Sequence, residues 1–139
     1  FVPGKASVIR EGADMTFIAC GVTVAMAAAA SDRLRQRGIS ARVLNMSSIK
    51  PIDREAVLRA ARETGAIVTC EEHNMLGGLG GAVSEVTSAE YPVPVRRVGT
   101  QDTFGESGTA DALLQKYGIT PGHMEQEAEL VLTMKKRFS

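Results

Sequence analysis

The chain has 139 residues, a length typical of one domain that buries its core without disulfides or bound metals. Its 16 Lys and Arg residues balance 16 Asp and Glu residues, and aromatic residues make up 4% of the sequence. The sequence therefore shows neither the basic stripe nor the stacking surface of a nucleic-acid-binding protein. It also has no apolar run near the roughly 20 residues of a transmembrane helix, so it predicts no contact with a membrane.

The chain begins FVPGKA, without methionine and without the pattern of a signal peptide, and we expect it to be a piece of a longer protein. Cys20 and Cys70 each end an apolar run, where a lone thiol packs as a small hydrophobic group. No C-x-x-C pattern is present. These features predict two free thiols in a cytoplasmic protein.

Short β-rich runs alternate with longer helical patterns along the chain. The predicted strands span residues 15–21, 41–47, 66–72 and 93–99, with a weaker candidate at 6–12. The first helix follows residue 21, and its alanines at 27–30 would let it lie close to a sheet. Gly38 suits its C-terminal cap, Asp53 would cap the second helix, and Gly65 would end it.

The third helix carries its apolar residues on one stripe, with Ser84, Glu85 and Ser88 turned away. The stripe consists of Leu79, Ala82, Val83 and Val86. Two more helices are predicted after the last strand. One is capped by Thr109 and ends at Gly118, and the other begins at Thr120 with Pro121 in its first turn. The alternation predicts parallel strands joined by right-handed crossovers, in a three-layer α/β/α sandwich that forms a single domain over residues 1–139.

The stretch EEHNMLGGLGG at 71–81 follows a predicted buried strand, the place where open α/β sheets bind ligands. A dinucleotide fingerprint that began at Gly78 and Gly80 would need glycine or alanine where Val83 stands, and no P-loop lysine follows. A turn or a protein interface is therefore favoured over phosphate binding. Glu72 and His73 are candidates for such an interface.

Acid–base catalysis and metal binding are less favoured at this stretch. Glu71 and Glu72 should point to opposite faces at the strand end, and the other histidine, His123, lies far along the chain. The motif FGESGT resembles a serine nucleophile elbow, but Thr109 stands where glycine is required. A helix cap at Ser107 or Thr109 is the favoured interpretation.

Several stretches together resemble the C-terminal domain of transketolases, in the order found in that family. They are GKASVIREGADMTFIACG, VLNMSSIKPID, IVTCEEHNMLGGLGGAVSE and VRRVGTQDTFGESGTADALLQKYGIT, and they span almost the whole chain. The same domain type closes 2-oxoacid dehydrogenase beta subunits and deoxyxylulose-phosphate synthases. The EEH and GGLGG details are most similar to transketolases.

The resemblance implies a five-stranded mixed sheet in the order 1-3-2-4-5 with an antiparallel first strand. Cys20 and Cys70 should then lie near each other on adjacent strands, and the loops after Gly21 and Glu72 should lie side by side.

The resemblance also implies a complete enzyme that transfers a two-carbon ketol unit between sugar phosphates, in the pentose phosphate pathway, with thiamine diphosphate and magnesium. The family holds both between an N-terminal domain and a pyrimidine domain that are missing from these residues. No catalytic, cofactor-binding or metal-binding residue transfers to this chain, which we expect to be inactive alone.

The implied role is assembly with the missing domains and within a homodimer, with Glu72, His73, Gly78 and Gly80 as interface candidates. Two alternatives remain open. The chain could be a stand-alone module that binds a small anion or a nucleotide, or it could be a dehydrogenase beta-subunit domain that docks a lipoyl carrier.

Overall fold

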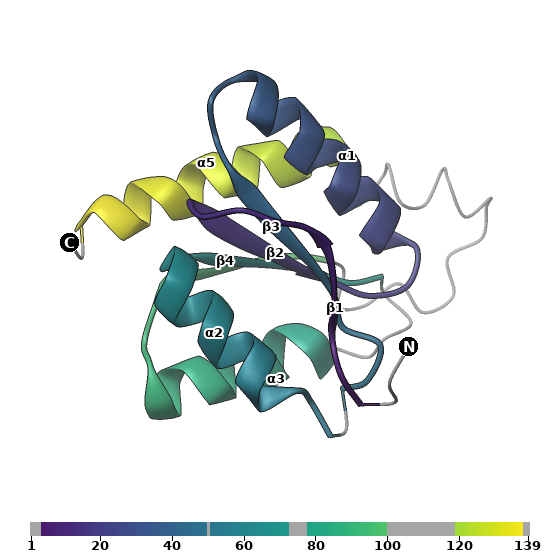
Figure 1. Cartoon of the computed structure of the whole chain (residues 1–139), viewed down its shortest axis with the longest axis vertical. Helices are drawn as coiled ribbons and strands as arrows, with labels where there is room; N and C mark the ends of the chain where they lie inside the picture. Colours follow the sequence, from purple (N-terminus) through teal and green to yellow (C-terminus); the bar gives the residue numbers. More distant parts are fainter. Residues whose placement is uncertain (1–3, 50, 73–77, 100–118, 138–139) are drawn as a thin grey trace.

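The computed structural model describes residues 4–49, 51–72, 78–99 and 119–137. Its centre is a five-stranded sheet in the order β1-β3-β2-β4-β5 (Figure 1). The strands are β1 (Ser7–Arg10), β2 (Met15–Ala19), β3 (Ala41–Asn45), β4 (Ile67–Cys70) and β5 (Val95–Val98). β1 pairs with β3 in the antiparallel sense, and all other pairs are parallel. Both the predicted strand order and the antiparallel first strand are confirmed.

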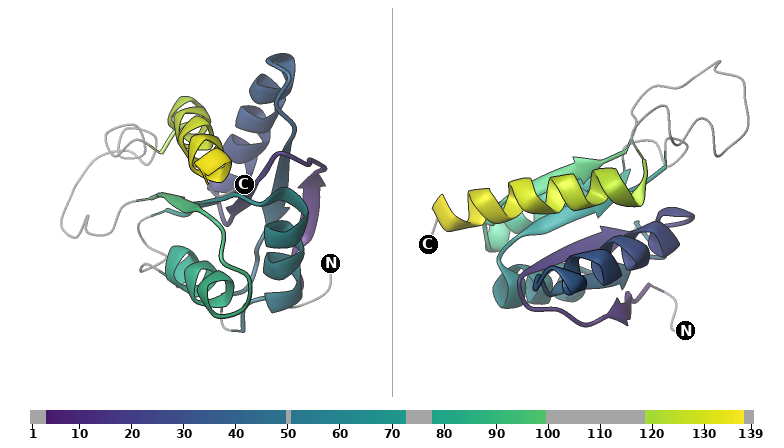
Figure 2. Two further views of the ribbon diagram at one scale, coloured as in Figure 1. Left: turned by 90° about the vertical axis from the view of Figure 1, so that its left-hand side faces the viewer. Right: turned by 90° about the horizontal axis from the view of Figure 1, so that it is seen from above.

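Helices cover both faces of the sheet, which confirms the three-layer α/β/α sandwich. They are α1 (Thr23–Gln36), α2 (Arg54–Thr64), α3 (Gly78–Glu90) and α5 (Pro121–Arg137). α1 and α5 lie on one face, and α2 and α3 lie on the other, as Figure 1 and the turned views of Figure 2 show. Within the described residues, no helix is both long enough and apolar enough to span a membrane.

Each face of the sheet has its own hydrophobic core because strand side chains alternate between faces. Phe17, Val43 and Val68 point toward α1 and α5, whereas Ile18, Leu44 and Ile67 point toward α2 and α3. On the first face, Ala27 and Ala30 of α1 are fully buried. The expected close packing of the alanine stretch against the sheet is confirmed.

The helix caps read from the sequence are present. The Asp53 carboxylate accepts a hydrogen bond from the Ala56 N–H at 3.2 Å, and the Thr120 hydroxyl accepts one from the His123 N–H at 3.1 Å. Gly38 and Gly65 follow α1 and α2 with φ of 81° and 73°, a backbone conformation that glycine adopts without steric cost. The predicted helix between Thr109 and Gly118 lies outside the described residues.

The strands are shorter than the apolar runs that predicted them. β2 ends at Ala19, because Cys20 and Gly21 already turn toward α1, and β4 ends at Cys70. β1 spans only Ser7–Arg10, and its register with β3 shifts between Val8 and Arg10. The apolar stripe of α3 is present: Leu79, Val83 and Val86 are buried and Ala82 is partly buried.

Candidate functional site

The crevice predicted at the carboxyl ends of the strands is formed by β2 and β4, which are neighbours in the sheet. The chain leaves β2 toward α1 on one face and leaves β4 toward α3 on the other face, so the two connections separate here. A Cβ atom added at Gly21 would lie 2.7 Å from Oε1 of Glu72. The segments at Gly21 and Glu72 therefore lie side by side, as expected.

Glu71 lies at this crevice but is committed to a structural contact. It is 8% exposed, and its carboxylate accepts hydrogen bonds from the N–H groups of Gly80 at 2.7 Å and Leu79 at 3.4 Å. These N–H groups belong to the first turn of α3, where a helix has no internal acceptors and carries a partial positive charge. Glu71 thus caps α3 from the strand, a role that the sequence analysis missed.

Thr23, the first residue of α1, contacts the carboxyl ends of both β2 and β4. Its buried hydroxyl lies 2.6 Å from the carbonyl oxygen of Cys20 and 2.8 Å from that of Cys70, and it accepts a hydrogen bond from the Cys20 N–H at 3.2 Å. The start of α1 is therefore fixed to the ends of both central strands. Sequence reasoning missed Thr23 because its partner at Cys70 lies far along the chain.

The glycines of the motif face other parts of the same chain. A Cβ atom at Gly80 would lie 2.8 Å from Cδ of Arg97, and one at Gly78 would lie 3.2 Å from Cγ2 of Ile49. Gly80 is buried, whereas Gly78 and Glu72 are partly exposed. By contrast, a Cβ atom at Gly81 would meet nothing within 4 Å. The close approach of other groups explains two glycines of the GGLGG motif without any ligand.

Of the remaining candidate residues, only His123 lies among the described residues. His73 lies outside the described residues, as do Ser107 and Thr109 of the FGESGT motif. His123 lies in the first turn of α5, where Nε2 is 3.8 Å from a carboxylate oxygen of Glu127. Glu127 in turn accepts two hydrogen bonds from the guanidinium of Arg96, at 2.7 and 3.2 Å.

The two cysteines are neighbours whose side chains point to opposite faces. Ala19 pairs with Cys70, and the Cys20 N–H donates to the Cys70 carbonyl at 3.2 Å. Cys20 belongs to the core beneath α2 and α3, whereas Cys70 belongs to the core beneath α1 and α5. Both thiols are free and buried. Burial, with a smaller contribution from Glu71 and Glu72, raises the pKa of Cys20 to about 11, and burial also raises the pKa of Cys70.

The chemistry available to the described part of the crevice is limited. Each oxygen of Glu71 accepts a helix N–H group, and burial holds both thiols in the neutral form. Among residues 4–49, 51–72, 78–99 and 119–137, no group of three or more His, Cys, Asp and Glu side chains could hold a metal ion.

The strand order, the antiparallel edge strand and the helices on both faces define a doubly wound α/β domain with its switch point between β2 and β4. The chain matches the family model of the transketolase C-terminal domain over residues 4–124. It belongs to the transketolase C-terminal domain family.

Within that family, the chain is similar to proteins named as transketolase subunits and to a solved transketolase structure. It is 48% identical over 138 residues to the 6-deoxy-6-sulfo-D-fructose transketolase subunit of Clostridium sp. (strain MSTE9), covering 99% of this chain and 42% of the relative. A solved structure described as a split gene transketolase, inactive beta4 tetramer, is 51% identical with a TM-score of 0.90, covering 97% and 44% of the two chains.

More distant relatives have a different reaction in their name. The 1-deoxy-D-xylulose-5-phosphate synthase of Heliobacterium modesticaldum (strain ATCC 51547 / Ice1) is 39% identical over 126 residues, covering 90% of this chain and 20% of the relative. The chain thus spans less than half the length of each of these proteins.

Proposed function

We propose that the chain is the C-terminal domain of a thiamine-diphosphate-dependent transketolase and that its role is assembly, without catalysis of its own. The observation that carries this proposal is the 51% identity, at a TM-score of 0.90, to a split gene transketolase that is described as inactive when it forms a beta4 tetramer. In that structure beta chains associate in a tetramer that is described as inactive, and the matched part is 44% of each such chain. The Clostridium relative is likewise named as a subunit.

In this proposal the N-terminal and pyrimidine domains of the same enzyme hold thiamine diphosphate and magnesium. The contact of Glu71 with the first turn of α3 supports this division, because turning its carboxylate to a cofactor would leave two helix N–H groups without their acceptors. The complete enzyme is a cytoplasmic homodimer that moves a two-carbon ketol unit between sugar phosphates.

The surface proposed for this assembly contains Glu72, His73, Gly78 and Gly80. Glu72 and Gly78 are partly exposed. Gly80 is buried under Arg97 and contributes by letting the first turn of α3 approach β5. A charge reversal Glu72→Lys should weaken association with the missing domains, whereas Glu85→Lys, on the exposed side of α3, should leave it intact.

The activity test compares the chain alone with the chain plus a polypeptide that carries the missing domains. Both samples receive xylulose 5-phosphate, ribose 5-phosphate, thiamine diphosphate and magnesium. The chain alone should give no ketol transfer, and the mixture should give transfer that is lost when either polypeptide is omitted. Turnover by the chain alone would overturn the proposal.

A second candidate function is the same assembly role in a 1-deoxy-D-xylulose-5-phosphate synthase. The 39% identity to the Heliobacterium relative favours it as the runner-up, below the 48% identity to the Clostridium transketolase subunit. Assaying the reconstituted mixture for 1-deoxy-D-xylulose 5-phosphate separates the two, because the leading proposal predicts none of this product.

A further inference from the structure

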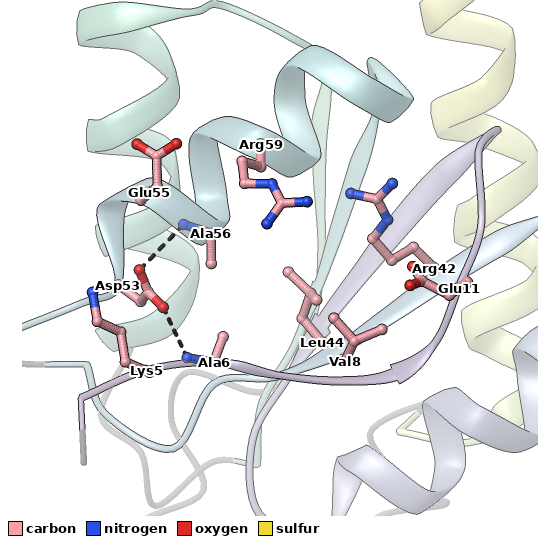
Figure 3. Close-up of a pocket in the computed structure, with 10 residues that line it drawn as sticks. All are labelled: Lys5, Ala6, Val8, Glu11, Arg42, Leu44, Asp53, Glu55, Ala56 and Arg59. Atoms are coloured by element: carbon pink, nitrogen blue, oxygen red, sulfur yellow. Dashed lines mark hydrogen bonds between the residues drawn. The ribbon is translucent and has the colours of Figure 1, made fainter. Parts of the chain in front are cut away.

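A cavity of about 260 Å³ lies between the edge strand β1 and helix α2, away from the crevice between β2 and β4 (Figure 3). It is lined by Lys5, Ala6, Val8, Glu11, Arg42, Leu44, Asp53, Glu55, Ala56 and Arg59. Its volume is slightly below that of a pocket for a drug-sized molecule, which suits a small metabolite.

The hollow exists because α2 does not cover the edge of the sheet. Val8 of β1 stands opposite Leu44 of β3 in the register, on the face that α2 covers, yet Val8 is 54% exposed. The residue that α2 presents here is Ala56, whose short side chain leaves the space open. The floor of the cavity is therefore apolar and open to solvent, within a rim of charged side chains.

Two arginines line the cavity from different elements, Arg42 from β3 and Arg59 from α2. Figure 3 shows the guanidinium groups of Arg42 and Arg59 turned toward one another above Leu44 and Val8. The Arg42 side chain is 13% exposed, and its direction is fixed because Nη1 lies 2.8 Å from Glu63 and Nε donates to the Gly12 carbonyl at 3.2 Å. Arg59 has a looser contact, with Nε 3.6 Å from the same carboxylate. The carboxylate of Glu63 is thus shared by the guanidinium groups of Arg42 and Arg59.

Two of the carboxylates on the rim are already engaged. Asp53 accepts hydrogen bonds from the N–H groups of Ala6 at 2.9 Å and Ala56 at 3.2 Å, so both of its oxygens are occupied (Figure 3). Glu55 lies 3.1 Å from Arg62, outside the cavity. Glu11 lies beside Arg42 (Figure 3), so the charged lining is mixed, with Lys5, Arg42 and Arg59 against Glu11, Asp53 and Glu55. What distinguishes the part of the cavity between Arg42 and Arg59 is that two guanidinium groups, which share Glu63, stand together beside an apolar floor.

We propose that this cavity binds a small molecule with one oxyanion group and a short apolar part. The oxyanion, a carboxylate or a phosphate monoester, lies between Arg42 and Arg59, because guanidinium groups match the geometry of both anions. The apolar part lies on Val8 and Leu44. The inference does not depend on the proposed function, since it uses none of the crevice residues.

The test is a titration of the ¹⁵N-labelled chain followed by NMR, with butyrate, methyl phosphate and sodium chloride at equal ionic strength. Saturable shifts should appear at the backbone amides of Ala6, Val8, Leu44 and Ala56 with at least one of the two organic anions. The probe that saturates first identifies the carboxylate or the phosphate as the preferred group. Shifts that chloride reproduces, or that never saturate, would overturn the proposal.

Matched variants test whether the anions bind in this cavity. Arg59→Gln should weaken it about tenfold or more, the effect of losing one charge-assisted hydrogen bond. Arg54→Gln on the same helix should leave it unchanged, because Arg54 pairs with Glu90 and does not line the cavity. Ala56→Leu should fill the cavity and abolish the saturable shifts while the thermal midpoint is retained. Equal effects of the two arginine variants, or unchanged binding by Ala56→Leu in a folded sample, would place the anions elsewhere and contradict the inference.

Discussion

Glu71 lies at the end of β4 and holds the first turn of α3 through two backbone N–H groups, of Leu79 and Gly80. A carboxylate next to a histidine and a glycine loop reads in the sequence as a candidate acid or base. In the fold, its charge instead stabilises the start of a helix, because the free N–H groups and the helix dipole both favour an anion there. This role depends on the placement of α3 over β4, which no local pattern encodes.

Paired substitutions distinguish the roles of the two glycines in the first turn of α3, Gly80 and Gly81. Gly81→Ala should raise the free energy of unfolding by about 0.5 to 1 kcal/mol, because alanine favours a helix and nothing lies within 4 Å of the added carbon. Gly80→Ala should lose that gain, since its Cβ would lie 2.8 Å from Cδ of Arg97. Urea unfolding of both variants measures the difference.

A double variant identifies the cause of that difference. Removing the obstructing side chain with Arg97→Ala should restore the helix-forming gain of Gly80→Ala, which would appear as a coupling between positions 80 and 97. Additive effects would show that the constraint on Gly80 comes from elsewhere, including a protein partner.

The raised pKa of the buried Cys20 thiol predicts how the free energy of unfolding depends on pH. Burial raises the pKa of Cys20 from 9.0 to about 11, so its contribution to stability is complete below pH 9 and is lost as the pH rises toward 11. Over this window the unfolded chain releases the thiol proton and the folded chain keeps it. The free energy of unfolding should therefore fall by up to about 1.4 kcal/mol per pH unit for this group.

Urea unfolding between pH 8 and pH 11 tests this expectation. Cys20→Ala should show a shallower decline, since one of the buried thiols is gone while every other titrating group is unchanged. Parallel curves for the two proteins would contradict the buried, neutral thiol.

At the scale of elements, β1 depends on a residue that belongs to the start of α2. Asp53 caps α2 through Ala56 and also accepts the N–H of Ala6, directly before β1. One side chain therefore joins the antiparallel edge strand to the helix beside it. This second contact links positions 47 residues apart, and the sequence pattern revealed only the cap.

Two substitutions at Asp53 separate its contacts. Asp53→Ala should lower the free energy of unfolding by about 2 kcal/mol, since it removes both the cap and the bond to β1. Asp53→Asn keeps one acceptor for the cap but offers Ala6 an N–H group, so it should cost less and act mainly on β1. Hydrogen exchange at Ala6 should accelerate in both variants. Full protection of Ala6 in Asp53→Asn would contradict the proposed link.

The sequence predicted helix ends correctly where a capping residue contacts backbone groups close to it in the chain. Asp53, Gly65 and Thr120 mark helix ends through contacts within about four residues, and these were confirmed. The strand ends were predicted too late, since an apolar residue such as Cys20 can be buried in a turn as well as in a strand. Burial and pairing are different properties, and hydrophobicity reports only burial.

At the scale of the whole molecule, α5 completes the core even though the family match ends within its first turns. The match covers residues 4–124, whereas Ala128 and Val131 are fully buried against the sheet. Arg33 of α1 and Arg37 directly after it also pair with Glu125, at 3.2 and 3.6 Å. The last part of α5 is therefore part of the fold.

A chain that ends at Met124 should fail to unfold cooperatively, whereas one that ends at Arg137 should melt like the full chain. The shorter chain loses the burial of Val131 and its neighbours, each large apolar side chain contributing about 1.5 to 3 kcal/mol against a total stability of about 5 to 15 kcal/mol. Thermal unfolding followed by circular dichroism measures this. A cooperative transition in the shorter chain would show that α5 is dispensable after its first turn.

The strand order and the meeting of Gly21 with Glu72 followed from the family resemblance, and the structure confirms both. The cavity beneath Ala56 could not be predicted in this way. It depends on how far α2 stops short of β1, and on a register shift in β1, which are properties of packing between distant segments.

The opposed cysteines make the two faces of the sheet separately observable. Cys20 is covered by α2 and α3, and Cys70 is covered by α1 and α5, although the two residues are joined by a backbone hydrogen bond. A thiol reagent reaches each sulfur only when the helices over it move away or the chain unfolds. The modification rate of each cysteine, followed by mass spectrometry, thus reports the opening of one layer of the sandwich, and equal rates would show that both layers open in a single event.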